Sequence, residues 1–177
     1  MENKGKQSLL GKEIRYVAGY REILIRPMQK EDVPKVSLIE EAAFSMPWSP
    51  DDFLDMVERA DSLYVTALCK GEPVGCCGVT NACGDGDVNN VVVEEGYRGL
   101  GIGKAMLCAM MEWGAALGIE NYTLEVRVSN TPAIRLYESI GFVSEGIRPN
   151  FYERPREDAM IMWKRQAEDG QITIPKS

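Results

Sequence analysis

The sequence contains no histidine, and this absence removes several kinds of enzyme at once. Ser-His-Asp and Cys-His catalysis both need an imidazole as the base, and most zinc sites need one as a ligand. An all-cysteine zinc site is the exception. A nucleophilic cysteine would lack the partner that activates it.

Cysteine is scarce as well, with five residues, no two of which form a Cys-x-x-Cys pair. Three of them sit in apolar runs, so we expect buried, reduced thiols, as in the cytosol. No apolar run reaches the roughly 18–20 residues that span a bilayer, and the N-terminus lacks the hydrophobic region of a signal peptide. We therefore predict a cytoplasmic protein with no membrane partner and no metal.

Positive charge is in deficit, because 20 Lys and Arg residues stand against 27 Asp and Glu residues, for a net charge of −7. The average field repels a phosphate backbone, so we expect no direct nucleic-acid partner. A cationic substrate matches this charge better, although moderate acidity also serves solubility alone. The length of 177 residues, with 45% hydrophobic and 27% charged residues, indicates a soluble globular protein with one domain.

Turn residues and hydrophobic periodicity divide the chain into an N-terminal extension (1–22), a domain (23–165) and a C-terminal tail (166–177). Within the domain they predict the element order βααβββαβαββ, with a helix cap at Ser49, a helix end at Gly118 and a bend at 148–152. Helices that follow individual strands indicate a mixed α/β sheet with helical layers on its faces. The clearest helix runs over 102–117, and we assign its Met and Trp stripe to the core rather than to a cofactor site.

A glycine-rich loop between a short apolar strand (91–93) and this helix is the most informative stretch. Glycines that precede a helix N-terminus form an anion site, most often for phosphate, because they expose unpaired backbone amides at the positive end of the helix dipole. The dinucleotide pattern G-x-G-x-x-G fails, since Lys104 stands at its last glycine. The Walker pattern fails, since Arg98 and Ala105 replace residues it needs. An ordinary glycine-rich connection remains an alternative.

The pattern that remains, Arg98-x-x-Gly101-x-Gly103, resembles the pyrophosphate loop of the GCN5-related N-acetyltransferases (GNAT), which hold acetyl-CoA. Further along, 124–130 (LEVRVSN) and 133–142 (AIRLYESIGF) are similar to the bacterial ribosomal-protein alanine N-acetyltransferases. They are more distantly similar to the catalytic subunits of N-terminal acetyltransferases. The turn Pro47-Trp48-Ser49 and the last hairpin extend the resemblance over roughly 23–163.

The resemblance implies a mostly antiparallel central sheet with helices on both faces and acetyl-CoA as co-substrate. It also implies that the strand before the loop pairs with the pantetheine arm and that the loop amides hold the pyrophosphate. Asn130 matches a residue that contacts CoA, although a helix cap is an equal explanation. The implied CoA-binding residues are Val91, Val92, Val93, Arg98, Gly99, Leu100, Gly101, Ile102, Gly103, Lys104 and Asn130.

Two side chains match the catalytic residues of the family. Glu125 lies on the polar side of an otherwise apolar strand, and the resemblance makes it the base that accepts the ammonium proton. A solvated or Arg127-paired carboxylate is the alternative. Tyr137 matches the proton donor to the thiolate, and the alternative is a core aromatic. A phenol is a weaker acid than a thiol, so we expect Tyr137 to act partly by hydrogen-bonding the sulfur.

The resemblance also implies the substrate, a protein N-terminus, with a ribosomal protein that begins with Ala or Ser as the expected partner. An α-amino group has a pKa of about 8 and a lysine about 10.4, so the former needs less help from a base. We expect Phe44, Trp48 and Tyr152 to line the peptide groove, and ordinary packing is an equal alternative for each. The alternatives are a GNAT enzyme for a small amine, such as a polyamine or aminoglycoside, and a non-catalytic acyl-CoA-binding module.

Overall fold

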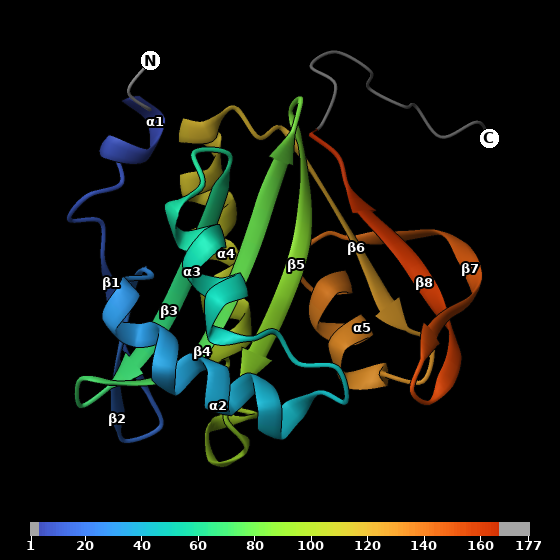
Figure 1. Cartoon of the computed structure of the whole chain (residues 1–177), viewed down its shortest axis with the longest axis horizontal. Coiled ribbons are helices and arrows are strands. Elements are labelled where there is room, and N and C mark those ends of the chain that lie inside the picture. Colours follow the sequence, from blue (N-terminus) through green and yellow to red (C-terminus); the bar gives the residue numbers. More distant parts are fainter. Residues whose placement is uncertain (1–3, 167–177) are drawn as a thin grey trace, which may run out of the picture.

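The frame of the computed structural model, which describes residues 4–166, is one eight-stranded sheet in the order β1-β2-β3-β4-β5-β6-β8-β7 (Figure 1). Within this range every neighbouring pair is antiparallel except β5 and β6, which are parallel. The strands are β1 Ile14–Ala18, β2 Arg21–Pro27, β3 Ser62–Cys69, β4 Glu72–Ala82, β5 Asp85–Val93, β6 Asn121–Arg127, β7 Val143–Glu153 and β8 Arg156–Lys164.

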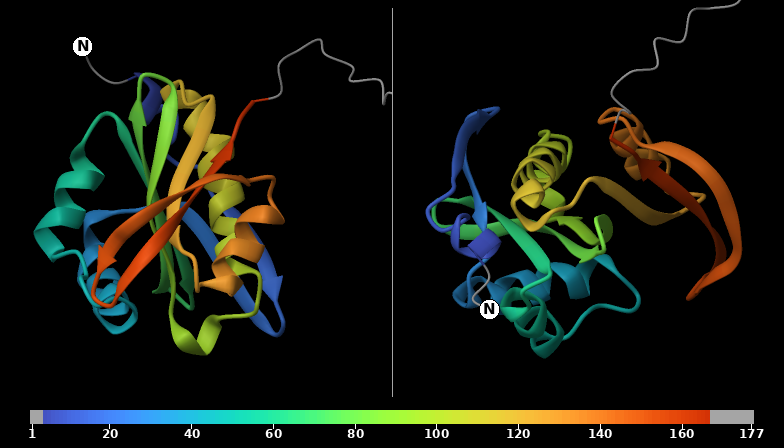
Figure 2. Two further views of the ribbon diagram at one scale, coloured as in Figure 1. Left: turned by 90° about the vertical axis from the view of Figure 1, so that its right-hand side faces the viewer. Right: turned by 90° about the horizontal axis from the view of Figure 1, so that it is seen from above.

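Helices cover both faces of this sheet (Figure 2). The helices α4 (Ile102–Gly114) and α5 (Thr131–Glu138) contribute to one buried cluster, and α2 (Val33–Ala43) and α3 (Pro50–Glu58) contribute to the other. The predicted mixed sheet with helices on both faces is confirmed. The short helix α1 (Lys4–Gln7) and three 3-10 turns, at Lys30–Asp32, Glu95–Tyr97 and Ala115–Leu117, complete the described elements.

The order of elements from β2 onward is the predicted βααβββαβαββ. Local signals account for the boundaries: Ser49 caps α3 by accepting a hydrogen bond from the Asp52 amide, and Gly118 ends the α4 region with a φ of 75°. Two predictions were wrong in extent. The strand before the glycine loop begins at Asp85, and the bend expected at 148–152 lies inside the continuous strand β7, where the register with β8 shifts.

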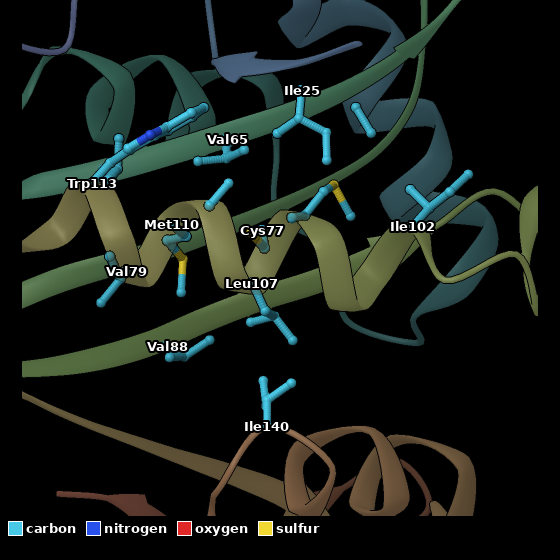
Figure 3. Packing of buried hydrophobic residues seen from close by; sticks show 14 of the residues in the cluster. Ile25, Val65, Cys77, Val79, Val88, Ile102, Leu107, Met110, Trp113 and Ile140 are labelled. Atoms are coloured by element: carbon cyan, nitrogen blue, oxygen red, sulfur yellow. The ribbon is translucent and has the colours of Figure 1, made fainter. Parts of the chain in front are cut away.

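The core on the α4 side is built on the predicted helical stripe (Figure 3). Met106 and Met110 are fully buried and Trp113 is nearly so, which confirms their assignment to the core. They pack against side chains of β2 to β5, including Ile25 and Val65. Burying one such side chain stabilises the fold by about 1.5–3 kcal/mol, so this face holds the sheet and α4 as one unit.

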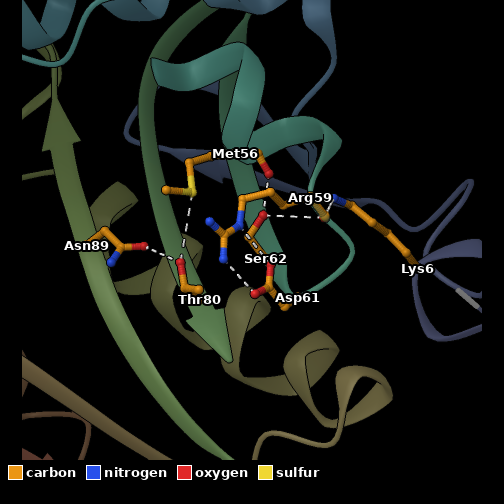
Figure 4. A network of polar contacts seen from close by, with 7 residues as sticks. All are labelled: Lys6, Met56, Arg59, Asp61, Ser62, Thr80 and Asn89. Atoms are coloured by element: carbon orange, nitrogen blue, oxygen red, sulfur yellow. Dashed lines mark hydrogen bonds and ion pairs between the residues drawn. The ribbon is translucent and has the colours of Figure 1, made fainter. Parts of the chain in front are cut away.

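The N-terminal residues pack onto the domain. Strand β1 pairs with β2, and Leu9 lies in the α4-side core with 2% of its surface exposed. The Lys6 ammonium donates to the Val57 carbonyl at 2.7 Å and to the Arg59 carbonyl, as part of a polar network at the end of α3 (Figure 4). The predicted tail, apart from Gln166, lies outside the described residues.

The parallel strands β5 and β6 separate soon after they begin, and this separation positions the site. They pair only from Asp85↔Asn121 to Asp87↔Thr123 within the described chain, and then diverge toward their carboxyl ends (Figure 1). A β-bulge at Asn89 shifts the register of β5 against β4 just beyond the last pair. Because α4 follows β5 and α5 follows β6, both helices begin at this open end.

All five cysteines are free; Cys69, Cys76 and Cys77 are buried, and Cys83 and Cys108 are exposed. Among residues 4–166, no helix combines the length and the apolar character that crossing a membrane requires.

Candidate active site

The loop between β5 and α4 has the backbone that its glycines predict. Gly99 and Gly101 have φ values of +74° and +78°, and Gly101 is the N-cap of α4. A β-carbon at either position would meet no described heavy atom within 4 Å, so the backbone conformation rather than crowding requires glycine. At Gly103 a β-carbon would lie 3.3 Å from Leu136 Cδ2, so the first turn of α4 sits close to α5.

This helix N-terminus suits an anion with several oxygens. The first amides of α4 have no partner within the helix and lie at its positive end. Lys104 lies in the first turn, which contains no acidic residue. The Arg98 guanidinium folds back toward the strand, and its Nε donates to the Val93 carbonyl at 2.9 Å. The structure therefore places residues 98–104 together, as the sequence predicts, and a pyrophosphate fits their chemistry.

One edge of the strand that leads into the loop is free. Val91, Val92 and Val93 pair with β4 on their other edge, whereas the pairing with β6 ends at Asp87. Among the described residues, no strand occupies the β6-facing edge of 91–93. An extended chain with amide groups, such as pantetheine, fits an edge of this kind as an added strand.

Glu125 lies on β6 between the buried residues Leu124 and Val126, on the opposite face of the strand. Its side chain is 28% exposed, and Oε1 lies 3.3 Å from Arg148 Nη1 of β7. Its backbone carbonyl accepts a hydrogen bond from the Tyr152 hydroxyl at 3.1 Å. Glu125 is therefore an accessible carboxylate held against a cation.

The alternative in which Arg127 pairs with Glu125 is wrong. Arg127 instead contacts Glu157 at 3.1 Å and donates to the carbonyls of Arg154 and Pro155. Its guanidinium also lies over the Tyr152 ring, 4.1 Å from the centroid. Arg127 lies on the same face of β6 as Glu125, two residues further on, so the sequence favours it as the partner. The actual partner, Arg148, comes from β7, and no local pattern indicates this.

Tyr137 lies on α5 with 8% of its surface exposed, and its ring packs on Phe142 with centroids 5.9 Å apart. Burial raises the pKa of its phenol, and the nearby Tyr152 and Cys77 raise it further. The phenol therefore stays protonated at neutral pH. The Tyr152 hydroxyl donates to the Glu125 carbonyl, and Tyr152 also raises the pKa of Tyr137. The two predicted catalytic residues therefore share Tyr152 as a neighbour.

Asn130 caps α5, because its Oδ1 accepts a hydrogen bond from the Ala133 amide at 3.3 Å. The capping alternative is confirmed. Contact of this residue with CoA remains a prediction.

The three predicted groove residues fall in two places. Tyr152 lies beside Glu125, since its hydroxyl donates to the Glu125 carbonyl, and its place in a peptide groove remains a prediction. Phe44 is 42% exposed at the end of α2, and Trp48 packs on Phe53 and Tyr64 in the α2–α3 cluster, with centroids 5.6 and 6.1 Å apart. The loop that carries both reaches the last hairpin, because the Ser45 hydroxyl donates to the Arg154 carbonyl at 2.5 Å.

One ionisable residue near this loop was missed by the sequence analysis. Glu40 of α2 is 2% exposed, and its Oε1 accepts a hydrogen bond from Asn90 Nδ2 of β5 at 2.8 Å. Burial raises the pKa of this carboxyl to about 7, although the Asn90 amide and the Trp48 backbone amide oppose the shift. The available signal was its place on the apolar stripe of α2, beside Val36 and Ile39.

A helix N-terminus that suits a phosphate, a strand edge without a strand partner before it, and a carboxylate on a diverging parallel strand are together typical of an acyl-CoA-dependent transferase. The chain belongs to the acetyltransferase (GNAT) family, whose sequence model matches residues 33–142. Members of this family transfer an acetyl group from acetyl-CoA, so acetyl-CoA is the co-substrate and the chain is an acetyltransferase.

Among its relatives, a Bacillus subtilis protein provisionally named as a ribosomal protein bS18-alanine N-acetyltransferase is 34% identical over 140 residues, which cover 78% of this chain and 93% of the relative. The Escherichia coli ribosomal protein bS18-alanine N-acetyltransferase is 32% identical over 141 residues, covering 78% and 94%. The crystal structure of an Escherichia coli enzyme of that name covers 86% of this chain and 99% of its own, with 29% identity and a TM-score of 0.75.

Proposed function

We propose that this acetyltransferase modifies the N-terminal α-amino group of a protein, and that its substrate is a ribosomal protein that begins with Ala or Ser. The observation that carries the proposal is the placement of Glu125 beside Tyr152, on the strand that diverges from the free edge of β5. Relatives named for this activity align over almost their whole length, which supports the same chemistry here. The proposed location is the cytoplasm, where ribosomal proteins are made.

Acetyl-CoA supplies the thioester, and the first task of the protein is to bind this co-substrate. The amides of residues 99–104 bind the pyrophosphate, with Arg98 and Lys104 adding charge. The free edge of 91–93 pairs with the pantetheine arm, and Asn130 contacts CoA from the start of α5. A backbone N–H in 91–93 then lies where it can stabilise the oxyanion that forms on the acetyl carbonyl. Positioning of this kind supplies much of the rate.

In the proposed mechanism Glu125 accepts the ammonium proton, directly or through water. The Arg148 guanidinium, 3.3 Å from Oε1, holds this carboxylate in place at the edge of the site. The amine nitrogen then attacks the acetyl carbon to form the tetrahedral oxyanion, which collapses as the carbon–sulfur bond breaks. The nitrogen loses its second proton, and the departing thiolate gains one, through solvent. Because an α-amino group has a pKa near 8, this base has only a modest task, which favours a protein N-terminus over a lysine side chain.

Tyr137 serves the leaving thiolate. Burial raises the pKa of its phenol, so it remains a hydrogen-bond donor and is a poor source of a fully transferred proton. We infer that it stabilises the negative charge on the sulfur by a hydrogen bond and keeps its own proton. Phe44, Trp48 and Tyr152 line the groove for the first residues of the substrate, and the net charge of −7 suits a basic ribosomal protein.

The test is a panel of peptides and small amines with acetyl-CoA, read by release of the CoA thiol. We expect turnover on peptides that begin with Ala or Ser. The matched control is the same peptide with a blocked N-terminus and one internal lysine, on which we expect none. Turnover confined to polyamines or aminoglycosides would overturn the proposal. Thermal stabilisation by CoA without acetylation of any amine would point to a non-catalytic binding module.

A further inference from the structure

The buried carboxyl of Glu40 lies between two segments of the proposed site and takes part in no step of the proposed acetyl transfer. Its Oε1 accepts the hydrogen bond from Asn90, which lies on β5 immediately before the free edge at 91–93. Asn90 is itself 5% exposed, and its Oδ1 accepts a hydrogen bond from the Tyr64 hydroxyl at 3.2 Å. One oxygen of Glu40 is thus tied to the thioester strand.

The other oxygen faces the substrate-groove loop, residues 44–49. Glu40 Oε2 is buried and has no hydrogen-bond partner among the described residues. The backbone amide of Trp48 lies close enough to favour the charged form of the carboxyl. A buried unpaired carboxylate oxygen costs free energy, and a nearby amide is its natural donor. Glu40 therefore has one firm bond to β5 and one available acceptor for the loop.

The surroundings of Glu40 provide no cation: none of the described Lys or Arg residues forms an ion pair with it. The titratable groups that face it are Tyr64 of β3 and Cys76 of β4. Burial, neighbouring groups and the Glu40 charge raise the pKa of both, so both are neutral near pH 7. From α3 the neighbour is the apolar Phe53, and from its own helix the adjacent Glu41 is exposed.

We propose that Glu40 is a positioning residue whose ionised carboxylate couples the substrate-groove loop 44–49 to strand β5, so that peptide binding is tighter when it carries its charge. The carboxylate accepts from Asn90 and from the Trp48 amide at once, whereas the protonated acid has only one good acceptor left. The coupling rests on the proposed function only in treating loop 44–49 as part of the peptide groove.

The first test uses the whole protein without substrate. In ¹⁵N-labelled wild-type protein, we expect the backbone amide of Trp48 and the side-chain amide of Asn90 to titrate with one midpoint near pH 7. The step disappears in Glu40→Gln and persists in the matched control Glu41→Gln, which removes an exposed carboxyl from the same helix. A Trp48 amide that ignores pH, or that titrates equally in Glu40→Gln, overturns the coupling.

A second variant covers the case in which Glu40→Gln does not fold. In Asn90→Ala, the carboxyl loses its firm donor, so the midpoint of the Trp48 amide moves to higher pH if the two segments share Glu40. An unchanged midpoint overturns the proposal. This readout needs no activity, so it remains decisive even if the peptide panel rejects the proposed substrate.

Kinetics add the functional readout. We expect Glu40→Gln to raise the KM for an N-terminal peptide about tenfold at pH 8, the scale of one hydrogen bond to a charged group, with the KM for acetyl-CoA within about twofold. The ratio of the variant's peptide KM to that of wild type shrinks toward pH 6. Titration of the peptide amine cancels in this ratio. A ratio independent of pH, or equal shifts for both substrates, contradicts the proposal.

Discussion

Glu125 is an ion-paired carboxylate, and only its location on β6 separates it from those on the adjacent β7–β8 hairpin. We predict that Glu125→Gln lowers kcat/KM by about 100-fold or more at pH 6.5, the scale of general base catalysis. The deficit shrinks toward pH 8.5, because the amine then loses its proton without help. The control is Glu145→Gln, which removes a carboxylate paired with Arg165 at 2.8 Å. Equal rates in the two variants would remove Glu125 from the mechanism.

Tyr137 is the buried tyrosine to which we assign a role in the reaction, at the leaving sulfur. We predict that Tyr137→Phe lowers kcat about 100-fold and changes the dissociation constant of acetyl-CoA less than twofold, since the phenol acts on the leaving sulfur. The matched variant is Tyr122→Phe, whose hydroxyl donates to the Met111 carbonyl at 2.9 Å. It costs about 1 kcal/mol of stability and leaves kcat unchanged. Similar kcat values in the two variants would mean that Tyr137 only packs.

Glu40 makes stability depend on pH. The pKa of its carboxyl is raised from 4.5 to about 7 in the folded protein, so between these values the folded state holds the proton more tightly than the unfolded chain. Its contribution is therefore most favourable below pH 4.5, falls as pH rises to 7, and is constant above. We predict that the free energy of unfolding of Glu40→Gln, relative to that of wild type, increases by about 2–3 kcal/mol as pH rises from 5 to 8. Urea unfolding at each pH measures this difference. A pH-independent difference would contradict this.

Single functional residues can be predicted from the sequence when they stand in a recognisable motif. Residues whose role depends on contacts with distant segments cannot. Glu125 and Tyr137 stand inside a long family match, so their numbers follow from the sequence. The partner of Glu125 does not, because Arg148 reaches it from β7, 23 residues away. In the sequence, Glu40 is one polar residue in a helix. Its buried carboxyl is hydrogen-bonded by Asn90, which is 50 residues away.

At the scale of elements, the glycine loop offers a direct comparison. We predict that Gly101→Ala costs about 1–2 kcal/mol of stability, because φ is +78° there, and weakens acetyl-CoA binding at least tenfold. The matched change is Gly96→Ala in the same loop, where a β-carbon meets no described atom within 4 Å and the φ is not positive. We expect Gly96→Ala to leave the stability and the affinity for acetyl-CoA nearly unchanged. Calorimetric titration with CoA that shows equal losses would refute the role of the loop.

Element types and order follow from periodicity, caps and turns, because these signals are local. Ser49 and Gly118 mark helix ends in the structure as they do in the sequence. Strand lengths are harder. The polar start of β5, at 85–90, gave no apolar run to recognise, and the proline and asparagine in β7 suggested a bend. In both cases pairing with a neighbouring strand extends an element beyond its own propensity.

At the scale of the molecule, the site depends on a pairing between distant segments. β5 and β6 are separated by α4 in the chain, yet they pair over three residues and then diverge. No local pattern specifies where such a pairing ends, so the open edge of β5 was implied by the family resemblance alone. The insertion of β8 between β6 and β7 is equally non-local.

The packing of the N-terminal residues raises the last question, whether 1–22 is an accessory segment or part of the fold. Leu9 and Leu10 provide a matched pair, since they are chain neighbours of one chemistry with 2% and 81% of their surface exposed. We predict that Leu9→Ala lowers the free energy of unfolding by about 3 kcal/mol, as for other buried leucines, and Leu10→Ala by less than about 0.5. Both keep wild-type kcat, since neither touches the site. Equal, small effects in thermal or urea unfolding would show that the burial of Leu9 does not stabilise the fold.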